Sequence, residues 1–270
     1  MRAKKSLGQN FLVDGRVAAR IVAALGPRAD ETVIEIGPGR GALTAGLLAR
    51  AGRVVAVEFD RDLFAELRAR FGASANFTLV EGDALEVDYC AIRAPAASAR
   101  VVANLPYNVS TAILQRLIAA RACVPEMVLM LQREVVARLC APPGAAERGY
   151  LSVLVEAYCE AEALFDVAPG AFRPAPKVWS TVVRLRARTH AAVAAADESL
   201  LWALVSAGFM QRRKTILNNL RHAPAPLAAR VNERGGAAAL LAAADLDPQR
   251  RAETLTIAEW ARLVEGLEGK

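Results

Sequence analysis

The chain has 270 residues, of which 54% are hydrophobic and 23% are charged, and its formal net charge is +6. That length allows one large domain or a core domain with an appendage, the apolar content excludes a disordered chain, and the longest apolar run, residues 237–244, is too short to span a membrane. The four cysteines, Cys90, Cys123, Cys140 and Cys159, form no C-x-x-C pair and the chain has only two histidines, so we expect buried or incidental reduced thiols and no metal site.

Positive charge is concentrated in two parts of the chain. Residues 1–20 carry a formal net charge of +4 and residues 184–222 carry +5, so the other 211 residues sum to −3. A basic arm over residues 1–13 and a basic C-terminal region are typical of a protein that binds a polyanion, although scattered surface arginines give the same totals. The arm lacks the apolar run of a secretory signal, so we expect a cytoplasmic protein.

After the arm, the sequence alternates between helical and strand patterns. Asp14 is expected to cap a helix with an apolar stripe that ends at Gly26. Five apolar runs rich in valine or isoleucine then predict strands buried on both faces of a parallel sheet. The predicted strands are Thr32–Ile36, Arg53–Glu58, Phe77–Glu81, Arg100–Asn104 and 127–131. Residues 42–50, Arg61–Phe71 and 111–121 have helical periodicity, which predicts a doubly wound α/β sheet.

The last third of the chain changes character. Residues 178–188 alternate like a strand, which we place near the edge of the sheet. From about residue 197 the periodicity is helical, and the alanine-rich stretch 190–196 has no strong period. We therefore expect a catalytic α/β domain over residues 1–190 and a small all-α domain over residues 191–270.

Acidic residues follow the first strands beside a glycine-rich loop. Gly37 and Gly39 precede a predicted helix, where the backbone can approach a ligand closely. Glu58 ends the second strand, 21 residues after Gly37, where a carboxylate can accept hydrogen bonds from a ribose diol. That pair suits NAD or S-adenosylmethionine. Asp83, after the third strand, can accept from an adenine amino group, and this pattern is typical of methyltransferases, so we expect S-adenosylmethionine.

The tetrapeptide Asn104-Leu105-Pro106-Tyr107 follows the fourth strand. The N6 lone pair of adenine is delocalised into the ring. Two acceptors, the Asn104 side-chain oxygen and the backbone carbonyl of Leu105 or Pro106, can hold its two N–H groups and aim the lone pair at a sulfonium methyl group. Tyr107 offers a ring for stacking on the target base. Phe172, in a proline-rich loop, forms either the opposite wall of that base pocket or part of the core.

A compact basic cluster follows in the predicted helical domain. Residues 211–215 read Gln-Arg-Arg-Lys-Thr, and Arg212, Arg213 and Lys214 are candidates for contacts with RNA phosphates. The competing interpretation is a solvated helix end. We place this cluster on a helix.

Six motifs in order resemble the ribosomal RNA adenine dimethyltransferase family, and within it the bacterial small-subunit branch. They are LGQNFL at 7–12, EIGPGRG at 35–41, NLPYNVST at 104–111, MLQREVV at 130–136, FRPAPKV at 172–178 and QRRKT at 211–215. The resemblance implies a Rossmann-like class I S-adenosylmethionine-dependent methyltransferase sheet. It implies four methyl transfers to N6 of two adjacent adenosines in the 3′-terminal hairpin loop of 16S rRNA, on an assembling small ribosomal subunit. The cofactor contacts that it implies are Asn10, Leu12, Gly37, Gly39, Glu58, Asp83, Ala84 and Asn104.

Two positions depart from the family pattern, and other functions remain open. Ala175 stands where a proline is common and Trp179 where a small polar or acidic residue is common, so the role of Trp179 is undecided. The related 23S rRNA adenine N6-methyltransferases of the macrolide-resistance type share the arm, the glycine loop and a similar tetrapeptide. A binding factor for ribosome assembly with dispensable catalysis is an alternative from another class. We expect a monomer.

Overall fold

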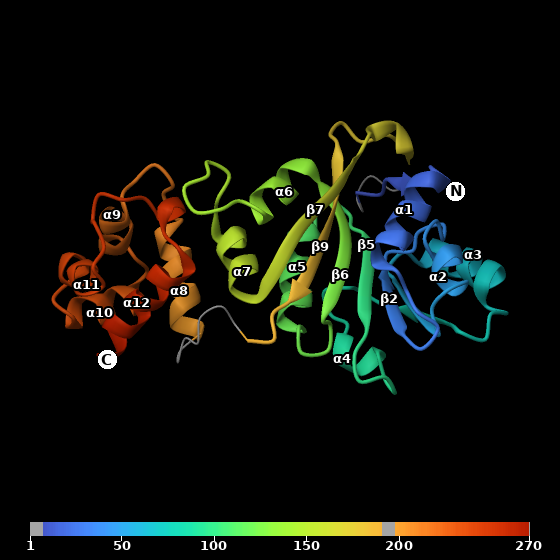
Figure 1. The fold of residues 1–270 in the computed structure, drawn as a ribbon, viewed down its shortest axis with the longest axis horizontal. Helices are drawn as coiled ribbons and strands as arrows, with labels where there is room; N and C mark the ends of the chain where they lie inside the picture. The colour runs from blue at the N-terminus through green and yellow to red at the C-terminus, as the bar shows by residue number, and fades with distance from the viewer. Residues whose placement is uncertain (1–7, 191–197, 270) are drawn as a thin grey trace. The chain divides into compact units, whose positions relative to one another are not determined.

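The computed structural model describes residues 8–190 and 198–269 (Figure 1). Its contacts divide the chain into an α/β unit, Met1–Val136 with Cys159–Ala187, and a helical unit, Ala137–Tyr158 with Arg188–Lys270. The helical unit thus includes a segment, Ala137–Tyr158, that the expected boundary at residue 190 assigns to the α/β domain. The first seven residues of the basic arm, with Arg2, Lys4 and Lys5, and most of the alanine-rich stretch lie outside the described residues.

A seven-stranded sheet forms the centre of the α/β unit (Figure 1). Its strands, in the order β4-β3-β2-β5-β6-β9-β7, are Phe77–Glu81, Arg53–Glu58, Thr32–Ile36, Arg100–Asn104, Glu126–Gln132, Ser180–Ala187 and Cys159–Val167. Strands β2 to β6 are parallel, whereas β9 and β7 are antiparallel to their neighbours. The strand order reverses between β2 and β5, which is where doubly wound sheets bind ligands. The prediction of an α/β methyltransferase-type sheet is confirmed.

Five predicted strands are present. Four of them are apolar runs that are largely buried, and β4, at the edge of the sheet, is half-buried. Four have the predicted bounds, and β6 extends one residue further at each end. Strand β9 lies inside the sheet, although its pattern predicts an edge position. That edge belongs to β7, which the sequence did not reveal, because alanine and glutamate alternate around Glu160 and Glu162 and both residue types are depleted in strands.

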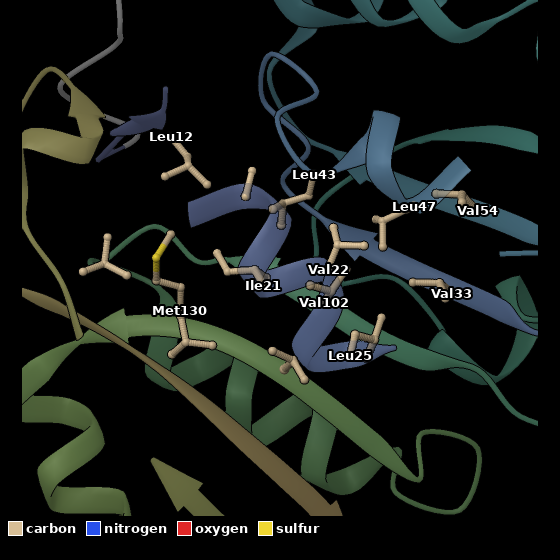
Figure 2. Close-up of a cluster of buried hydrophobic side chains, with 14 of the residues drawn as sticks. Leu12, Ile21, Val22, Leu25, Val33, Leu43, Leu47, Val54, Val102 and Met130 are labelled. Atoms are coloured by element: carbon tan, nitrogen blue, oxygen red, sulfur yellow. The ribbon is translucent and has the colours of Figure 1, made fainter. Parts of the chain in front are cut away.

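Helices α1 to α6 accompany the sheet strands in the chain. They are Gly15–Leu25, Thr44–Leu48, Arg61–Phe71, Tyr89–Ile92, Ser110–Ala119 and Arg133–Leu139. As predicted, the Asp14 side chain accepts hydrogen bonds at the start of α1, and Gly26 ends that helix with φ 59°. Ile21, Val22 and Leu25 of α1 enter a cluster of buried apolar side chains with residues of the sheet and of α2 (Figure 2). This core holds α1 against the sheet, and the sheet in turn positions the loops that follow its strands.

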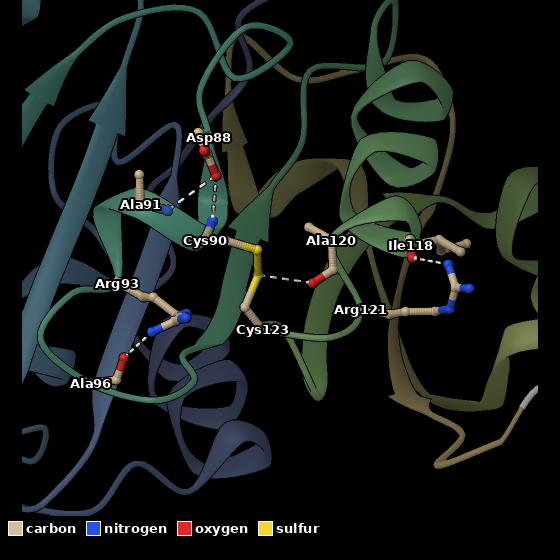
Figure 3. The surroundings of a disulfide bond; sticks show 9 residues. All are labelled: Asp88, Cys90, Ala91, Arg93, Ala96, Ile118, Ala120, Arg121 and Cys123. Carbon is tan, nitrogen blue, oxygen red and sulfur yellow. Dashed lines mark hydrogen bonds between the residues drawn. A yellow bond between two sulfur atoms is a disulfide. The ribbon is translucent and has the colours of Figure 1, made fainter.

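A disulfide joins Cys90 and Cys123 (Figure 3). The prediction of incidental reduced thiols is therefore wrong for this pair. Cys90 lies on α4, whose start is capped by Asp88, and Cys123 lies just after α5. The two Cα atoms are 5.5 Å apart although 33 positions separate the residues, so no local motif marks the pair.

In the helical unit, the predicted apolar stripe of the helix that starts near residue 197 is buried. Its helices α7 to α12 are Tyr150–Tyr158, Glu198–Gly208, Ile216–Arg221, Ala225–Glu233, Ala237–Ala243 and Ile257–Glu268. Leu201, Leu204 and Val205 of α8 are buried, and Trp260 of α12 packs so closely on Gly208 that a Cβ there would lie 2.4 Å from the indole ring. None of the helices in the described part of the chain is long and apolar enough to cross a membrane.

Candidate active site

A cleft with a cavity volume of about 180 Å³ opens at the carboxyl ends of β2, β3, β4 and β5, partly toward solvent. The loops that follow these four strands line it, together with residues of the N-terminal arm. The predicted site residues on its wall are Asn10, Gly37, Gly39, Glu58, Asp83, Ala84, Asn104, Leu105, Pro106 and Tyr107.

The glycine loop forms the floor beside β2. Gly37 and Gly39 have φ values of 65° and 58°, a backbone conformation that favours glycine. A Cβ at Gly39 would lie 3.0 Å from the ring of Phe11, so a side chain there would displace the arm. The Gly39 N–H donates to the Glu58 carboxylate at 3.1 Å, which ties the loop to the end of β3.

Glu58 is held as an oriented acceptor. Its Oε2 accepts from Gly39, while its Oε1 accepts from the backbone N–H groups of Phe59 and Asp60 at 2.9 and 2.8 Å. Burial raises the pKa of Glu58, and these three hydrogen bonds oppose the rise. A carboxylate has about four acceptor positions, so Oε2 retains room for one more donor, such as a sugar hydroxyl.

Asp83 presents a carboxylate at the end of β4. Its Oδ1 accepts from the Leu85 N–H at 2.8 Å, which leaves Oδ2 to accept from a ligand. The neighbouring Ala84 is buried, and its carbonyl accepts from the Tyr89 hydroxyl at 2.6 Å. The loop is therefore fixed from both sides, with its acidic group on the cleft wall.

The tetrapeptide presents two acceptors to the cleft. The Asn104 Nδ2 donates to the backbone carbonyl of Asn10 at 3.1 Å, so the amide nitrogen is engaged and the Oδ1 is the remaining acceptor. The Pro106 carbonyl already accepts from the Val109 N–H at 3.3 Å. Of the two carbonyls that the sequence leaves open, this geometry favours Leu105 as the second acceptor.

Tyr107 is half-buried and held by its hydroxyl. That hydroxyl lies 2.7 Å from the Oγ of Ser180, the first residue of β9. Burial raises the pKa of Tyr107, so the phenol stays protonated at neutral pH. The ring is thereby held on the cleft wall.

Phe172 and Leu12 lie elsewhere than predicted. Phe172 is fully buried in the apolar cluster, and Leu12 is 6% exposed in the same cluster. The two residues face each other in a small antiparallel sheet of β1, Phe11–Leu12, and β8, Phe172–Arg173. The prediction of Phe172 as a base-stacking wall is wrong for this structure, because the strand pairing turns its ring into the core. Leu12 contributes to a smaller cavity beside Gly37 rather than to the main cleft.

Three neighbours complete the cleft wall without having been predicted. The Gln9 side chain donates to the Asp60 carboxylate at 2.7 Å, which fastens the arm beside the end of β3. Phe59 lines the cleft and is 57% exposed, so its ring is available to a ligand. The positions of Phe59 and Asp60 directly after Glu58 were the only sequence signal for them.

The basic cluster lies in the turn between α8 and α9 rather than on a helix. Arg212, Arg213 and Lys214 are exposed, and Thr215 caps α9. Arg212 also donates to the carbonyls of Ala146 and Arg148 at 2.5 and 3.0 Å, so part of its role is structural. The cluster keeps a concentrated positive charge at the surface of the helical unit.

The donors and acceptors of the cleft fit the expected cofactor. Acidic acceptors follow β3 and β4, which suits sugar hydroxyls and an adenine amino group, and the glycine loop leaves space for a close backbone approach. Within the described residues, no group of three or more His, Cys, Asp or Glu side chains is placed to hold a metal ion.

Known proteins share both sequence and fold with this chain. A family model described as ribosomal RNA adenine dimethylase matches residues 1–263. Ribosomal RNA small subunit methyltransferase A of Hahella chejuensis is 43% identical over 264 residues, which cover 98% of this chain and 92% of that protein. The crystal structure of the 23S rRNA methyltransferase ErmE aligns with a TM-score of 0.71 at 27% identity, covering 96% of this chain and all of that one. A dimethyladenosine transferase from Plasmodium falciparum shares the fold with a TM-score of 0.75 at 24% identity, covering 94% and 95% of the two chains.

Proposed function

The chain belongs to the ribosomal RNA adenine dimethylase family, and from this premise we propose that it dimethylates two adjacent adenosines in the 3′-terminal hairpin loop of 16S rRNA. It is an S-adenosylmethionine-dependent methyltransferase that acts on ribosomal RNA. Each adenosine receives two methyl groups on N6 in this proposal. The observation that carries it is the Asn104 amide, which is oriented by the Asn10 carbonyl at 3.1 Å beside the Leu105 carbonyl and the Tyr107 ring.

The proposed roles of the cleft residues follow from their hydrogen bonds. Glu58 and Asp83 hold the sugar and the adenine of S-adenosylmethionine, which supplies an electrophilic methyl group when bound. The Asn104 Oδ1 and the Leu105 carbonyl accept the two N6–H groups of the target adenine. Tyr107 stacks on the base, which must leave its RNA stack to enter the cleft. Water can accept the proton released from N6, so a strong base is not needed.

The similarity to relatives supports the small subunit as the substrate. The identity to a protein named small subunit methyltransferase A is 43%, against 27% to the 23S rRNA methyltransferase ErmE. We propose that the chain acts in the cytoplasm as a monomer, on an assembling small subunit rather than on naked RNA. The exposed turn with Arg212, Arg213 and Lys214 binds rRNA phosphates in this proposal, and their charge supports it.

The substrate can be tested by mapping the product. The chain is incubated with labelled S-adenosylmethionine and either unmethylated small subunits or large-subunit RNA. We expect N6,N6-dimethyladenosine at two neighbouring positions in the 3′-terminal hairpin of the small subunit. Label found only in large-subunit RNA would contradict the proposal and identify the macrolide-resistance activity. Full complementation of a deletion strain by Asn104→Ala would instead identify a binding factor with dispensable catalysis.

A further inference from the structure

Two exposed apolar side chains directly precede β9, whose first residue contacts Tyr107 of the cleft wall. Trp179 is 44% exposed and Val178 is 39% exposed, whereas the next residue, Ser180, is 1% exposed. Exposed indole rings are uncommon on protein surfaces and often mark binding sites. Neither the core nor the roles proposed for the cleft residues account for Trp179.

Trp179 is fixed in place by the start of α6. Its backbone carbonyl accepts from the Arg133 N–H at 2.9 Å. This bond continues the pairing of β6 with β9, whose last pair is Gln132 with Ser180. The Arg133 guanidinium lies over the indole ring, 5.9 Å from its centroid. An arginine beside an exposed ring adds positive charge to an apolar surface. We call Arg133 and Trp179 together the indole platform.

The indole platform is connected to the cleft through one residue. Ser180 follows Trp179 in the chain, and its Oγ lies 2.7 Å from the hydroxyl of Tyr107. Tyr107 lines the cleft, and the platform stands at the end of β6 and the start of β9, beside the strand that carries the tetrapeptide. A nucleotide chain that places one base against Tyr107 has its neighbouring nucleotides close to this edge.

The charge around the indole platform favours a polyanion. Exposed Lys177 lies two residues before Trp179 in the same loop, and Arg133 is also exposed. Glu134, next to Arg133, is an exposed acidic group of the same surface. Two cations against one carboxylate, beside an exposed aromatic ring, match the composition of a single-stranded nucleic-acid site.

We propose that the indole ring of Trp179 stacks on an unpaired base of the substrate RNA next to the adenosine in the cleft. Arg133 supports the ring and contacts the adjoining phosphate. This inference rests on the proposed RNA methyltransferase function and names a second base-binding position for it. Stacking is possible for every base, so the position contributes affinity and orientation of the loop rather than a sequence preference.

The first test compares variants in methylation of unmethylated small subunits. Trp179→Ala is expected to raise the KM for subunits about tenfold with kcat changed little, because stacking of one base contributes this much affinity or more. Trp179→Phe should recover most of the loss. The matched control is Phe165→Ala, which removes another ring that faces an arginine. Phe165 lies on the edge strand β7, and the Arg20 guanidinium is 3.8 Å from the centroid of its ring. An unchanged KM in Trp179→Ala would overturn the proposal.

The second test uses RNA with an abasic nucleotide beside the target adenosine. If Trp179 stacks on that base, the abasic RNA and the Trp179→Ala variant should each weaken binding. The variant should bind the abasic RNA no more weakly than the wild-type chain does, because the stacking contact is already lost. Independent, additive losses would contradict the stacking contact. Binding of S-adenosylmethionine should be equal in all variants. Failure of the wild-type chain to label small-subunit RNA would refute the proposed function, whereas normal labelling with no effect of Trp179→Ala would refute only the indole platform.

Discussion

The two units of the molecule place their carboxylates in opposite environments. In the α/β unit, Glu35 is 1% exposed beside the glycine loop, and burial raises its pKa to about 7. In the helical unit, Glu259 accepts from the Arg250 guanidinium at 2.6 Å, and this hydrogen bond lowers its pKa to about 2. The first unit thus buries an acid beside its glycine loop, whereas in the second an arginine pairs with Glu259 and a basic turn is exposed. The difference agrees with the proposed roles of the two units, a small-molecule site in the first and a surface for rRNA in the second.

The largest expected effect concerns the acceptor pair at the cleft. Asn104→Ala should reduce the methyl-transfer rate about 10³-fold, because one preorganised acceptor of the reacting amine is lost. Asn104→Asp keeps an acceptor but loses the donor to the Asn10 carbonyl, so an intermediate rate is expected. The rates are measured by label incorporated into unmethylated small subunits under single-turnover conditions. A wild-type rate in Asn104→Ala would contradict the proposed catalytic role of the cleft in the α/β unit.

Glu35 provides a test of the buried-acid side of the comparison. Between pH 4.5 and about 7 the folded chain holds a proton that the unfolded chain has released. The free energy of unfolding therefore falls as pH rises through this window, by on the order of 3 kcal/mol from this group, and stays lower above it. Glu35→Gln keeps an acceptor for the Thr44 hydroxyl and removes the titration. Thermal unfolding should show the variant gaining stability relative to wild type from pH 5 to pH 8, and parallel curves would contradict this.

Glu259 should behave in the opposite direction. Its pKa is lowered in the folded chain, so its contribution to stability is present above pH 4.5 and is lost as pH falls toward about 2. Glu259→Gln breaks the pair with Arg250 and part of the capping box of α12, and should destabilise the helical unit by about 2 kcal/mol at pH 7. Urea unfolding at several pH values measures the difference, which should shrink with acidification. A constant difference would show that packing, not charge, is responsible.

The smallest expected effect concerns the exposed turn of the helical unit. The double variant Arg213→Gln with Lys214→Gln should weaken rRNA binding about tenfold at 0.15 M salt and lower the salt slope by about 2. Arg212 is left unchanged, because it also holds backbone carbonyls. The matched control removes Arg50 and Arg61, two exposed arginines of the α/β unit. An equal loss in both double variants would mean that net charge alone governs binding.

The sequence predicts the sheet well because the signal is local. The strands around Ile34, Val55 and Val101 are buried on both faces, and their apolar runs stand out without any knowledge of partners. Strand β7 was missed because its alanines and glutamates have weak strand propensity, and only pairing with β9 defines it. The disulfide of Cys90 was missed for a related reason, since it depends on two distant segments meeting.

The sequence predicts the contacts of the site that side chains make, and it does not predict the contacts that backbone groups make. Glu58 and Asp83 follow strands, so their place on the cleft wall follows from sheet topology. The carbonyl of Asn10 orients Asn104, but every residue has a carbonyl, so no residue type signals it. Phe172 was misplaced because its orientation depends on the pairing of β8 with β1, which is a tertiary choice.

The pairing of β1 with β8 also fixes the order in which the cleft can be completed during synthesis. Phe11 and Leu12 leave the ribosome early, whereas Arg173 and Phe172, which they face, follow only after all the strands that line the cleft. Contacts between such distant segments form late in folding, since a long loop must close first. A nascent chain that ends before β8 therefore lacks the strand partner that holds the arm, and with it the anchor for Asn104. Activity should arise only once translation has passed this point.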